Sequence, residues 1–387
     1  MARSKSKKRV DAARDLWRQM LDRAKDSEWS TFDDPEYQHP GFDEESVTQA
    51  LLNAGWSEQH IELRNQVDAE RNEAAPITSP GVARMTEASL FRLSQCVEMA
   101  REQIGARNRD RVHFVVEPKA GPFISKINVP MTDESIISMG SVFTRYCGLI
   151  SRAYIRTTLL CPNCAGSKYD EDFLRRQLRR NPDLLFYWWR IFVSFALTGT
   201  HVLTEFKPST KEEVILVEQM AFAMEIFGLS HEYAHHALDH GRNVEDLDGA
   251  KREEFEADAF AMRLCESVED DQRWKWIKGI EVPNPYLSAG AGGILLLGSL
   301  DIYRKVKNKM FNNRVYDTHP EFIDRSQRIK NRHVMQPNRF QSSLDFCASV
   351  ENVLIYVIGE LEPIMKTYPY AALVNSSPGD WEVMSFE

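Results

Sequence analysis

Apolar residues recur three and four positions apart along most of this chain, a spacing that predicts amphipathic or buried helices. Near the N-terminus it predicts helices over Val10–Lys25, Asp43–Leu52 and Ser57–Asn72. The segment Asn72–Gly81 holds two prolines and a glycine and is expected to be a linker. Further helices are expected at Met85–Ile104, Glu134–Ile155, Glu171–Phe206 (with a break near Pro182), Glu212–His240, Lys251–Val268, Tyr286–Lys307 and Ser343–Leu361.

Two β-rich runs interrupt this helical pattern. Val112–Val116 and Phe123–Val129 flank Lys119-Ala120-Gly121, which predicts a β-hairpin. The expected fold class is therefore α+β, mostly α, with a small hairpin or sheet. We expect an N-terminal helical region and linker over residues 1–80, a main domain over 81–335, and a C-terminal helix and tail over 336–387 packed on it.

Two apolar segments are tested as membrane helices. Leu184–Leu203 is long enough to span a bilayer, but Arg190 lies near its middle and Trp188 and Trp189 lie inside it instead of at an interface. Ser288–Leu300 is too short to span. Both segments are expected to be buried core helices, and membrane association is not expected.

Composition and charge narrow the class of protein. The 387 residues are 43% hydrophobic, which is ordinary for a globular protein. The net charge of −9 argues against a dedicated nucleic-acid-binding protein, which is usually basic. One basic run stands at the N-terminus, where a solvated terminus is favoured over contact with RNA, DNA or an anionic membrane. The run comprises Arg3, Lys5, Lys7, Lys8 and Arg9.

The cysteines are sparse for the chain length and show no disulfide-framework spacing. No secretory signal is expected, because the N-terminus is charged and precedes an amphipathic helix, so the predicted location is the cytoplasm. Cys161 and Cys164 form a CxxC pair that would suit half of a zinc knuckle, but no second CxxC or CxxH completes it. Reduced loop thiols are favoured there. The six cysteines are Cys96, Cys147, Cys161, Cys164, Cys265 and Cys347.

The string His231-Glu232-Tyr233-Ala234-His235 has the form HExxH. Two histidines at i and i+4 share one face of a helix and can bind one metal ion, with the adjacent Glu232 placed to hold the metal's water. The preceding segment Val214–Leu229 is strongly apolar, so this helix is expected to be buried. Buried imidazoles need partners, which zinc or ordinary hydrogen bonds can supply.

A second string, Glu254-Phe255-Glu256-Ala257-Asp258, favours zinc over hydrogen bonds alone. Glu254 and Asp258 are four apart and share a helix face. One carboxylate can complete a His-His-Glu site, and the other can accept the free ring N–H of a ligating histidine. The sequence therefore predicts one catalytic Zn²⁺ ion bound by His231, His235 and Glu254, with Asp258 behind a histidine.

HExxH followed by ExxAD resembles the gluzincin metallopeptidases, and is especially similar to the HtpX and CAAX-prenyl-protease group; the ImmA/IrrE and Lit proteases are looser comparisons. Thr318-His319-Pro320 with Arg325 also resembles a THP-x4-R string of that group. The resemblance covers roughly residues 113–328 and implies a zincin-like domain. It further implies that His319 steadies the oxyanion or substrate, that Arg325 holds the site together, and that the hairpin binds a peptide by backbone pairing.

The function predicted from these motifs is a soluble zinc-dependent endopeptidase. Glu232 would take the proton of the attacking water and later deliver it to the leaving amine. His236 and His240 lie on the same helix but are not expected to be catalytic. The partner is a protein or peptide substrate, and the sequence predicts no particular oligomeric state.

Other functions remain open. The chain would suit a cytoplasmic toxin, phage-defence or regulatory protease with one specific protein target. A non-catalytic binding module stabilised by zinc is a further alternative, but a structural site has no use for the carboxylate of Glu232. A peptidase fold acting on a non-peptide amide also remains open.

Overall fold

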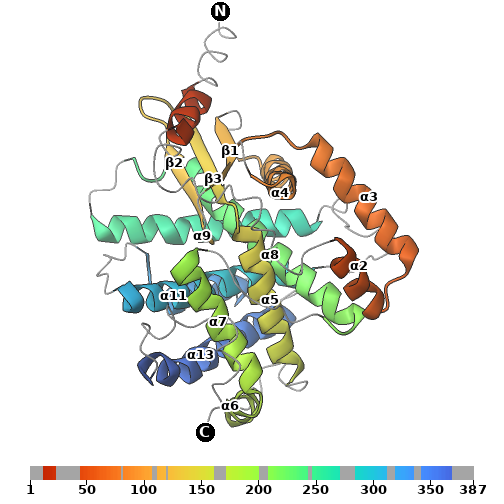
Figure 1. Cartoon of the computed structure of the whole chain (residues 1–387). Coiled ribbons are helices and arrows are strands. Elements are labelled where there is room, and N and C mark those ends of the chain that lie inside the picture. Colours follow the sequence, from red (N-terminus) through yellow and green to blue (C-terminus); the bar gives the residue numbers. More distant parts are fainter. Residues whose placement is uncertain are drawn as a thin grey trace, which may run out of the picture.

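The computed structural model describes most of the chain between residues 12 and 367 (Figure 1). The described ranges are residues 12–22, 44–79, 82–106, 111–118, 121–160, 171–199, 208–242, 246–270, 284–311, 319–334 and 341–367. Described helices greatly outnumber described strands, which confirms the predicted α+β, mostly α fold class.

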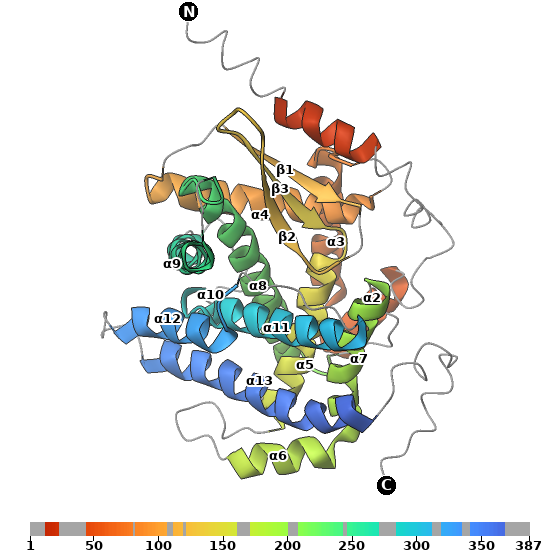
Figure 2. The ribbon, with the colours of Figure 1, turned by 90° about the vertical axis from the view of Figure 1, so that its left-hand side faces the viewer.

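The N-terminal part contributes a helix over residues 12–22, followed by α2 (Glu44–Asn53) and α3 (Glu58–Ala74). Helix α3 begins where the sequence provides a cap, because Ser57 Oγ accepts the backbone N–H of His60. The helix over residues 12–22 buries Trp17 in a small cluster with sheet residues, so it covers part of the sheet (Figure 2).

The sheet has three strands, β1 (Val112–Glu117), β2 (Ile124–Asn128) and β3 (Ser135–Gly140), in the order β1-β3-β2. Strand β3 is parallel to β1 and antiparallel to β2. The predicted hairpin is therefore wrong, because β3 lies between its two proposed strands. The helix expected over Glu134–Ile155 is wrong at its start. Every residue of β3 is buried, including Ser135 and Ser138, so its sequence lacks the alternation of apolar and polar residues that marks a half-buried strand.

The remaining helices form the body of the molecule. The break near Pro182 is confirmed, since α7 starts with that proline at a position where no backbone N–H is needed. These helices are α4 (Arg84–Gln103), α5 (Phe143–Leu159), α6 (Glu171–Arg180), α7 (Pro182–Thr198), α8 (Lys211–Ala237), α9 (Leu247–Asp270), α10 (Pro285–Ser288), α11 (Ala291–Phe311), α12 (Phe322–Val334) and α13 (Gln341–Thr367).

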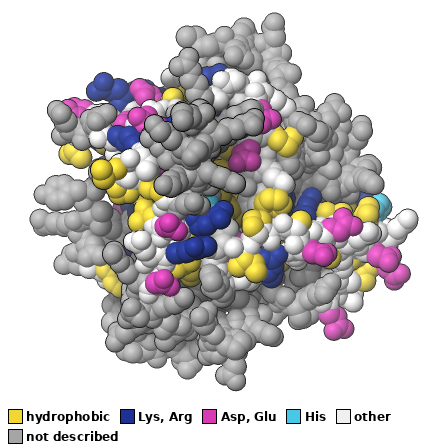
Figure 3. Space-filling model, turned by 90° about the horizontal axis from the view of Figure 1, so that it is seen from above, with side chains coloured by type: hydrophobic (Ala, Val, Ile, Leu, Met, Phe, Trp, Pro, Cys, Tyr) yellow, Lys and Arg dark blue, Asp and Glu magenta, His cyan; other side chains and the backbone are white. Residues whose placement is uncertain are grey.

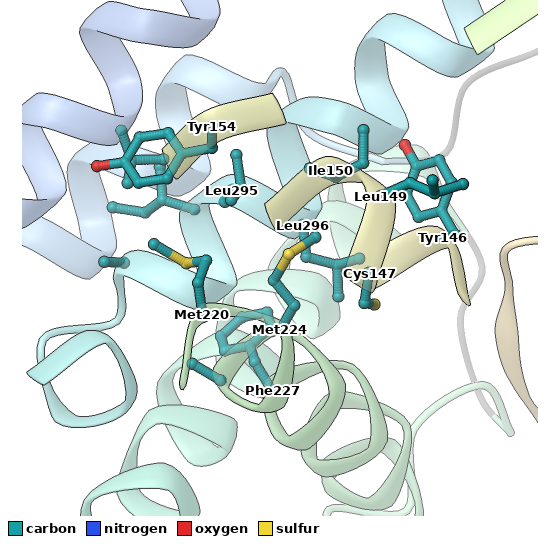
Figure 4. Close-up of a cluster of buried hydrophobic side chains, with 14 of the residues drawn as sticks. Tyr146, Cys147, Leu149, Ile150, Tyr154, Met220, Met224, Phe227, Leu295 and Leu296 are labelled. Atoms are coloured by element: carbon teal, nitrogen blue, oxygen red, sulfur yellow. The ribbon is translucent and has the colours of Figure 1, made fainter. Parts of the chain in front are cut away.

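Helix α8 occupies the centre of this body and contacts β2, β3 and the helices α4, α5, α9, α10 and α11 (Figure 2). Its apolar residues Met220, Met224 and Phe227 pack among side chains of α5 and α11 (Figure 4). Helix α11 approaches it closely at two glycines. A Cβ on Gly292 would lie 2.6 Å from the backbone of Ala223, and one on Gly293 would lie 2.5 Å from the Phe227 ring.

The segment predicted as one helix from Tyr286 to Lys307 is divided into α10 and α11. Gly290 separates them with φ of +77°, a left-handed conformation that L side chains rarely adopt. A Cβ there would also lie 2.7 Å from the Ile329 side chain, so the turn needs glycine. The sequence pattern did not predict α12, a short helix in which polar and charged residues outnumber apolar ones.

Helix α7, which covers most of the predicted core segment Leu184–Leu203, is largely buried in the main hydrophobic cluster. Among the described residues, α8 alone is long and apolar enough to cross a membrane, and 67% of its most apolar window is buried inside the protein. Acidic and basic side chains are interspersed among the described residues on the face seen in Figure 3. The N-terminal basic run lies outside the described residues.

Candidate metal centre and active site

Helix α8 brings His231 and His235 together. Its N-terminus is capped by Thr210, and its second half is almost wholly buried, so the two histidines occupy fixed positions one turn apart. The two Nε2 atoms lie 3.1 Å from each other, so both rings point at one place.

Helix α9 brings the third group. Glu254 Oε2 lies 3.4 Å from His231 Nε2, and Glu254 Oε1 lies 3.4 Å from His235 Nε2. Ligand atoms about 2.0–2.2 Å from a tetrahedral zinc ion stand roughly 3.3 Å apart, which is close to these separations. Glu254 Oε2 is buried without a hydrogen-bond partner among the described residues. The three groups can therefore hold a metal ion, and their chemistry fits zinc with a fourth position left open.

The electrostatics of this cluster favour a positive charge. Burial lowers the pKa of His231, but the carboxylates of Asp258 and Glu254 outweigh burial and raise that pKa to about 10. Burial alone would raise the pKa of Glu254, yet the two imidazoles and Arg325 hold it far below its usual range. A cation between the imidazoles and the carboxylate would satisfy the same preference.

Asp258 and Arg325 form a buried layer behind His231. Asp258 Oδ1 lies 3.0 Å from His231 Nδ1, on the side of the ring away from Nε2. The Arg325 guanidinium donates two hydrogen bonds to the Asp258 carboxylate, at 2.7 and 2.6 Å, and a third nitrogen lies 3.3 Å from Glu254 Oε2. This arrangement places Arg325 where it fixes Asp258, which in turn fixes the His231 ring.

Glu232 stands beside the metal-binding cluster and lines a pocket together with His231, His319 and Arg325. Burial raises the pKa of Glu232 to about 7, although neighbouring positive groups and a hydrogen bond from the backbone N–H of Lys126 oppose this. A carboxyl group whose pKa lies near neutrality suits both the acceptance and the return of a proton.

The structure also places His240 against the second histidine of the pair, which the sequence did not indicate. Helix α8 ends, Asp239 adopts a left-handed φ of 59°, and the backbone N–H of His240 donates to the His235 carbonyl at 2.9 Å. His240 Nδ1 then lies 3.0 Å from His235 Nδ1, and its Nε2 lies 3.2 Å from Glu256. Lys126 Nζ donates to the carbonyls of both histidines. The only sequence signal was a histidine five residues after His235.

A second group of potential ligand atoms comprises His235, His240 and Glu253. His235 already directs Nε2 toward His231 and Nδ1 toward His240. Glu253 accepts the backbone N–H of Gly241 at 3.0 Å. We therefore interpret His235, His240 and Glu253 as a hydrogen-bond network around the cluster of His231, His235 and Glu254.

The remaining predicted site residues differ in placement. His319 Nε2 lies 3.8 Å from Glu254 Oε1 with 35% of its side chain exposed, so it borders the cluster. His236 points away and its Nδ1 lies 2.9 Å from the hydroxyl of Ser135 in β3. Cys161 and Cys164 lie outside the described residues.

Comparison with known families adds independent information about this region. Residues 199–343 match the family model Peptidase U49, a span that contains α8, α9 and α12. The match supports a peptidase, but it does not single out the gluzincin or HtpX groups that the motifs resemble. No curated protein and no solved structure matches the chain.

Proposed function

We propose that this protein is a zinc-dependent endopeptidase that acts on a protein or peptide substrate in the cytoplasm. The observation that carries the proposal is the convergence of His231 Nε2, His235 Nε2 and the Glu254 carboxylate within 3.4 Å of one another, with Glu232 beside them. The Peptidase U49 match over the same helices supports a peptidase.

His231, His235 and Glu254 would hold the ion. When bound, zinc supplies Lewis acidity that polarises a carbonyl and lowers the pKa of water. Asp258 accepts the Nδ1–H of His231, which leaves Nε2 of that ring free to act as a ligand. Arg325 keeps Asp258 ionised and oriented, since it lowers the pKa of that buried carboxyl against the effect of burial.

Glu232 would carry the proton. Its carboxylate accepts a proton from the attacking water and returns it to the departing amine, as its pKa near 7 permits. His319 borders the cluster and is partly exposed, so it is placed to donate a hydrogen bond to the substrate carbonyl oxygen as charge develops there.

Strand β2 would hold the substrate backbone. Gly140 donates to the Phe123 carbonyl, and Val129 donates to the Glu134 carbonyl, which fixes the hydrogen-bonded positions of the β2–β3 pair. The alternate residues of β2 therefore turn their N–H and C=O groups away from β3. One of these, Lys126, directs its N–H to Glu232, so the outer edge of β2 faces the site. An extended peptide can add to this edge by backbone pairing.

The test compares the parent with Glu232→Gln. Each protein is purified, its bound zinc is measured, and its cleavage of a mixed protein substrate is followed. We expect both to retain one zinc ion and only the parent to cleave. Glu218→Gln is the matched control, because this exposed glutamate lies on the same helix and its loss should change neither property. Equal cleavage by parent and Glu232→Gln would refute the assignment, as would a parent that binds no zinc.

A further inference from the structure

A pocket opens at Glu232 and His231, which line it together with His319 and Arg325. The apolar part of its wall comes from the start of β2, the N-terminus of α5, the centre of α8 and one stripe of α11. The apolar residues that line it are Phe123, Ile124, Phe143, Phe227, Leu296, Leu297 and Leu300, with Arg304 further along the α11 stripe.

Gly228 lines this pocket and lets its wall pack closely against α8. A Cβ at this position would lie 2.9 Å from the Phe143 ring, 3.1 Å from Leu296 Cδ2 and 3.4 Å from Ile124 Cδ1. All three of these atoms belong to side chains that line the pocket. Gly228 also stands one turn before His231 on the same face of α8. These three lining side chains therefore pack directly against Gly228 at the floor of the pocket, and a methyl group at this position would push them into the pocket, next to the metal-binding cluster.

The outer end of the pocket remains open to an apolar group. The Phe123 side chain is 38% exposed, whereas Phe143 and Phe227 are each 1% exposed. Phe123 stacks edge-on against Tyr303, which holds the ring at the rim. An apolar side chain that enters past Phe123 would be removed from water where it contacts these walls.

We infer that this pocket, floored by Gly228, makes the enzyme select substrates with a large apolar side chain directly beside the cleaved bond. The inference rests on the proposed peptidase function, because it assigns the pocket to that site's substrate. Gly228 is the specificity-determining position, and leucine, isoleucine, methionine or phenylalanine is the side chain selected. Burial of such a side chain favours it over alanine by at least tenfold.

The test measures binding of two hydroxamates that share one metal-binding group and backbone but carry a methyl or an isobutyl side chain. This readout uses the zinc-loaded full chain and requires no turnover. For the parent we expect the isobutyl compound to bind at least tenfold more tightly. For Gly228→Ala we expect the ratio to fall below about threefold, with affinity for the methyl compound unchanged.

Gly359→Ala is the matched control. This glycine also lies within a helix, α13, but a Cβ there meets no atom within 4 Å. Both substitutions raise helix propensity equally, so only the pocket distinguishes them. Gly359→Ala should retain the parent ratio. Leu300→Ala covers the case in which Gly228→Ala does not fold: it widens the pocket and should shift preference from the isobutyl to a bulkier benzyl compound.

Cleavage-site profiling on a denatured peptide library is the second measurement. We expect large apolar residues to be enriched at one position flanking the cut in the parent, and this enrichment to weaken in Gly228→Ala. Hydroxamates that bind without discrimination in the parent, or equal ratios in Gly228→Ala and Gly359→Ala, would overturn the pocket assignment alone. Failure of the parent to bind zinc and either hydroxamate would overturn the proposed function itself.

Discussion

Replacement of Arg325 by methionine should destabilise the metal-free protein by about 3–5 kcal/mol. Arg325 is 5% exposed and donates to both oxygens of Asp258, whose side chain is 3% exposed. Methionine retains the apolar stem of the arginine but removes its charge. Among the described residues, the Asp258 carboxylate then keeps the His231 ring as its one close side-chain partner.

This magnitude follows from the geometry. Two charge-assisted hydrogen bonds of 2.7 and 2.6 Å are lost, together with the 3.3 Å contact to Glu254. Loss of one partner from a buried pair costs more than the pair contributes, because the other charge remains out of water. Most domains have only about 5–15 kcal/mol of total stability, so the loss is large. Zinc should reduce this loss of stability, because it would neutralise the Glu254 carboxylate. It would not contact Asp258, because the His231 ring lies between them.

The assay is urea unfolding of the chelator-treated protein, followed by tryptophan fluorescence and far-UV circular dichroism. Arg325→Lys should lose about 1–2 kcal/mol, since it keeps the charge but not the two-pronged contact. Arg328→Met is the control: this exposed arginine lies one turn further along α12, over the Phe255 ring, and should lose about 1 kcal/mol or less. A loss below about 1 kcal/mol in Arg325→Met, or equal losses in both methionine variants, would refute the reasoning.

Three further outcomes follow from other buried groups. His240→Ala should weaken zinc binding by about 10–100-fold in competition with a chromophoric chelator, because His235 loses the partner of its Nδ1; unchanged affinity would contradict this. Burial raises the pKa of Glu225 to about 7 from 4.5, so the folded protein takes up a proton in this range. Glu225 should therefore contribute a fall of roughly 2–3 kcal/mol in the unfolding free energy as pH rises from 4.5 through 7, and Glu225→Gln should show a decline smaller by that amount than the parent in urea titrations. Burial raises the pKa of Cys347 to about 12 and that of Cys265 above its usual range, so mass spectrometry should find both alkylated by iodoacetamide only after denaturation.

The long helices were predictable because their apolar spacing extends over many turns. Helices α8 and α9 were expected within a few residues of their observed ends, and this placed the three candidate ligands on facing helices. The spacing within HExxH and ExxAD is local, so helix geometry alone brings each pair of side chains to one face. For this reason the cluster of His231, His235 and Glu254 could be predicted before any tertiary contact was known.

The sheet and the surroundings of the cluster could not be predicted in the same way. Strand β3 is short and wholly buried, and its mixture of Ile, Met and Ser does not alternate, so periodicity does not distinguish it from a buried helix. Its pairing with β1 also joins separate parts of the chain. The contact of His240 with His235 depends on a left-handed residue after α8, which the type of residue, Asp239, does not specify. The pocket beside Gly228 forms where α5, α8, α11 and β2 pack together. Such packing between distant segments cannot be predicted from the local sequence of any one of them.

The close approach of α11 to α8 also bears on how this protein can evolve. A side chain at Gly292 would meet the backbone of Ala223, so the two helices cannot be shifted relative to each other by changes at that contact without separation of the core. The distance between α11, which lines the pocket, and the histidines of α8 therefore stays the same when other residues change. Changes in the shape of the pocket would then come from altered side-chain size at single lining positions such as Gly228, Leu297 and Leu300. The same contact between α8 and α11 that stabilises the fold thus restricts changes in the pocket to substitutions of individual side chains.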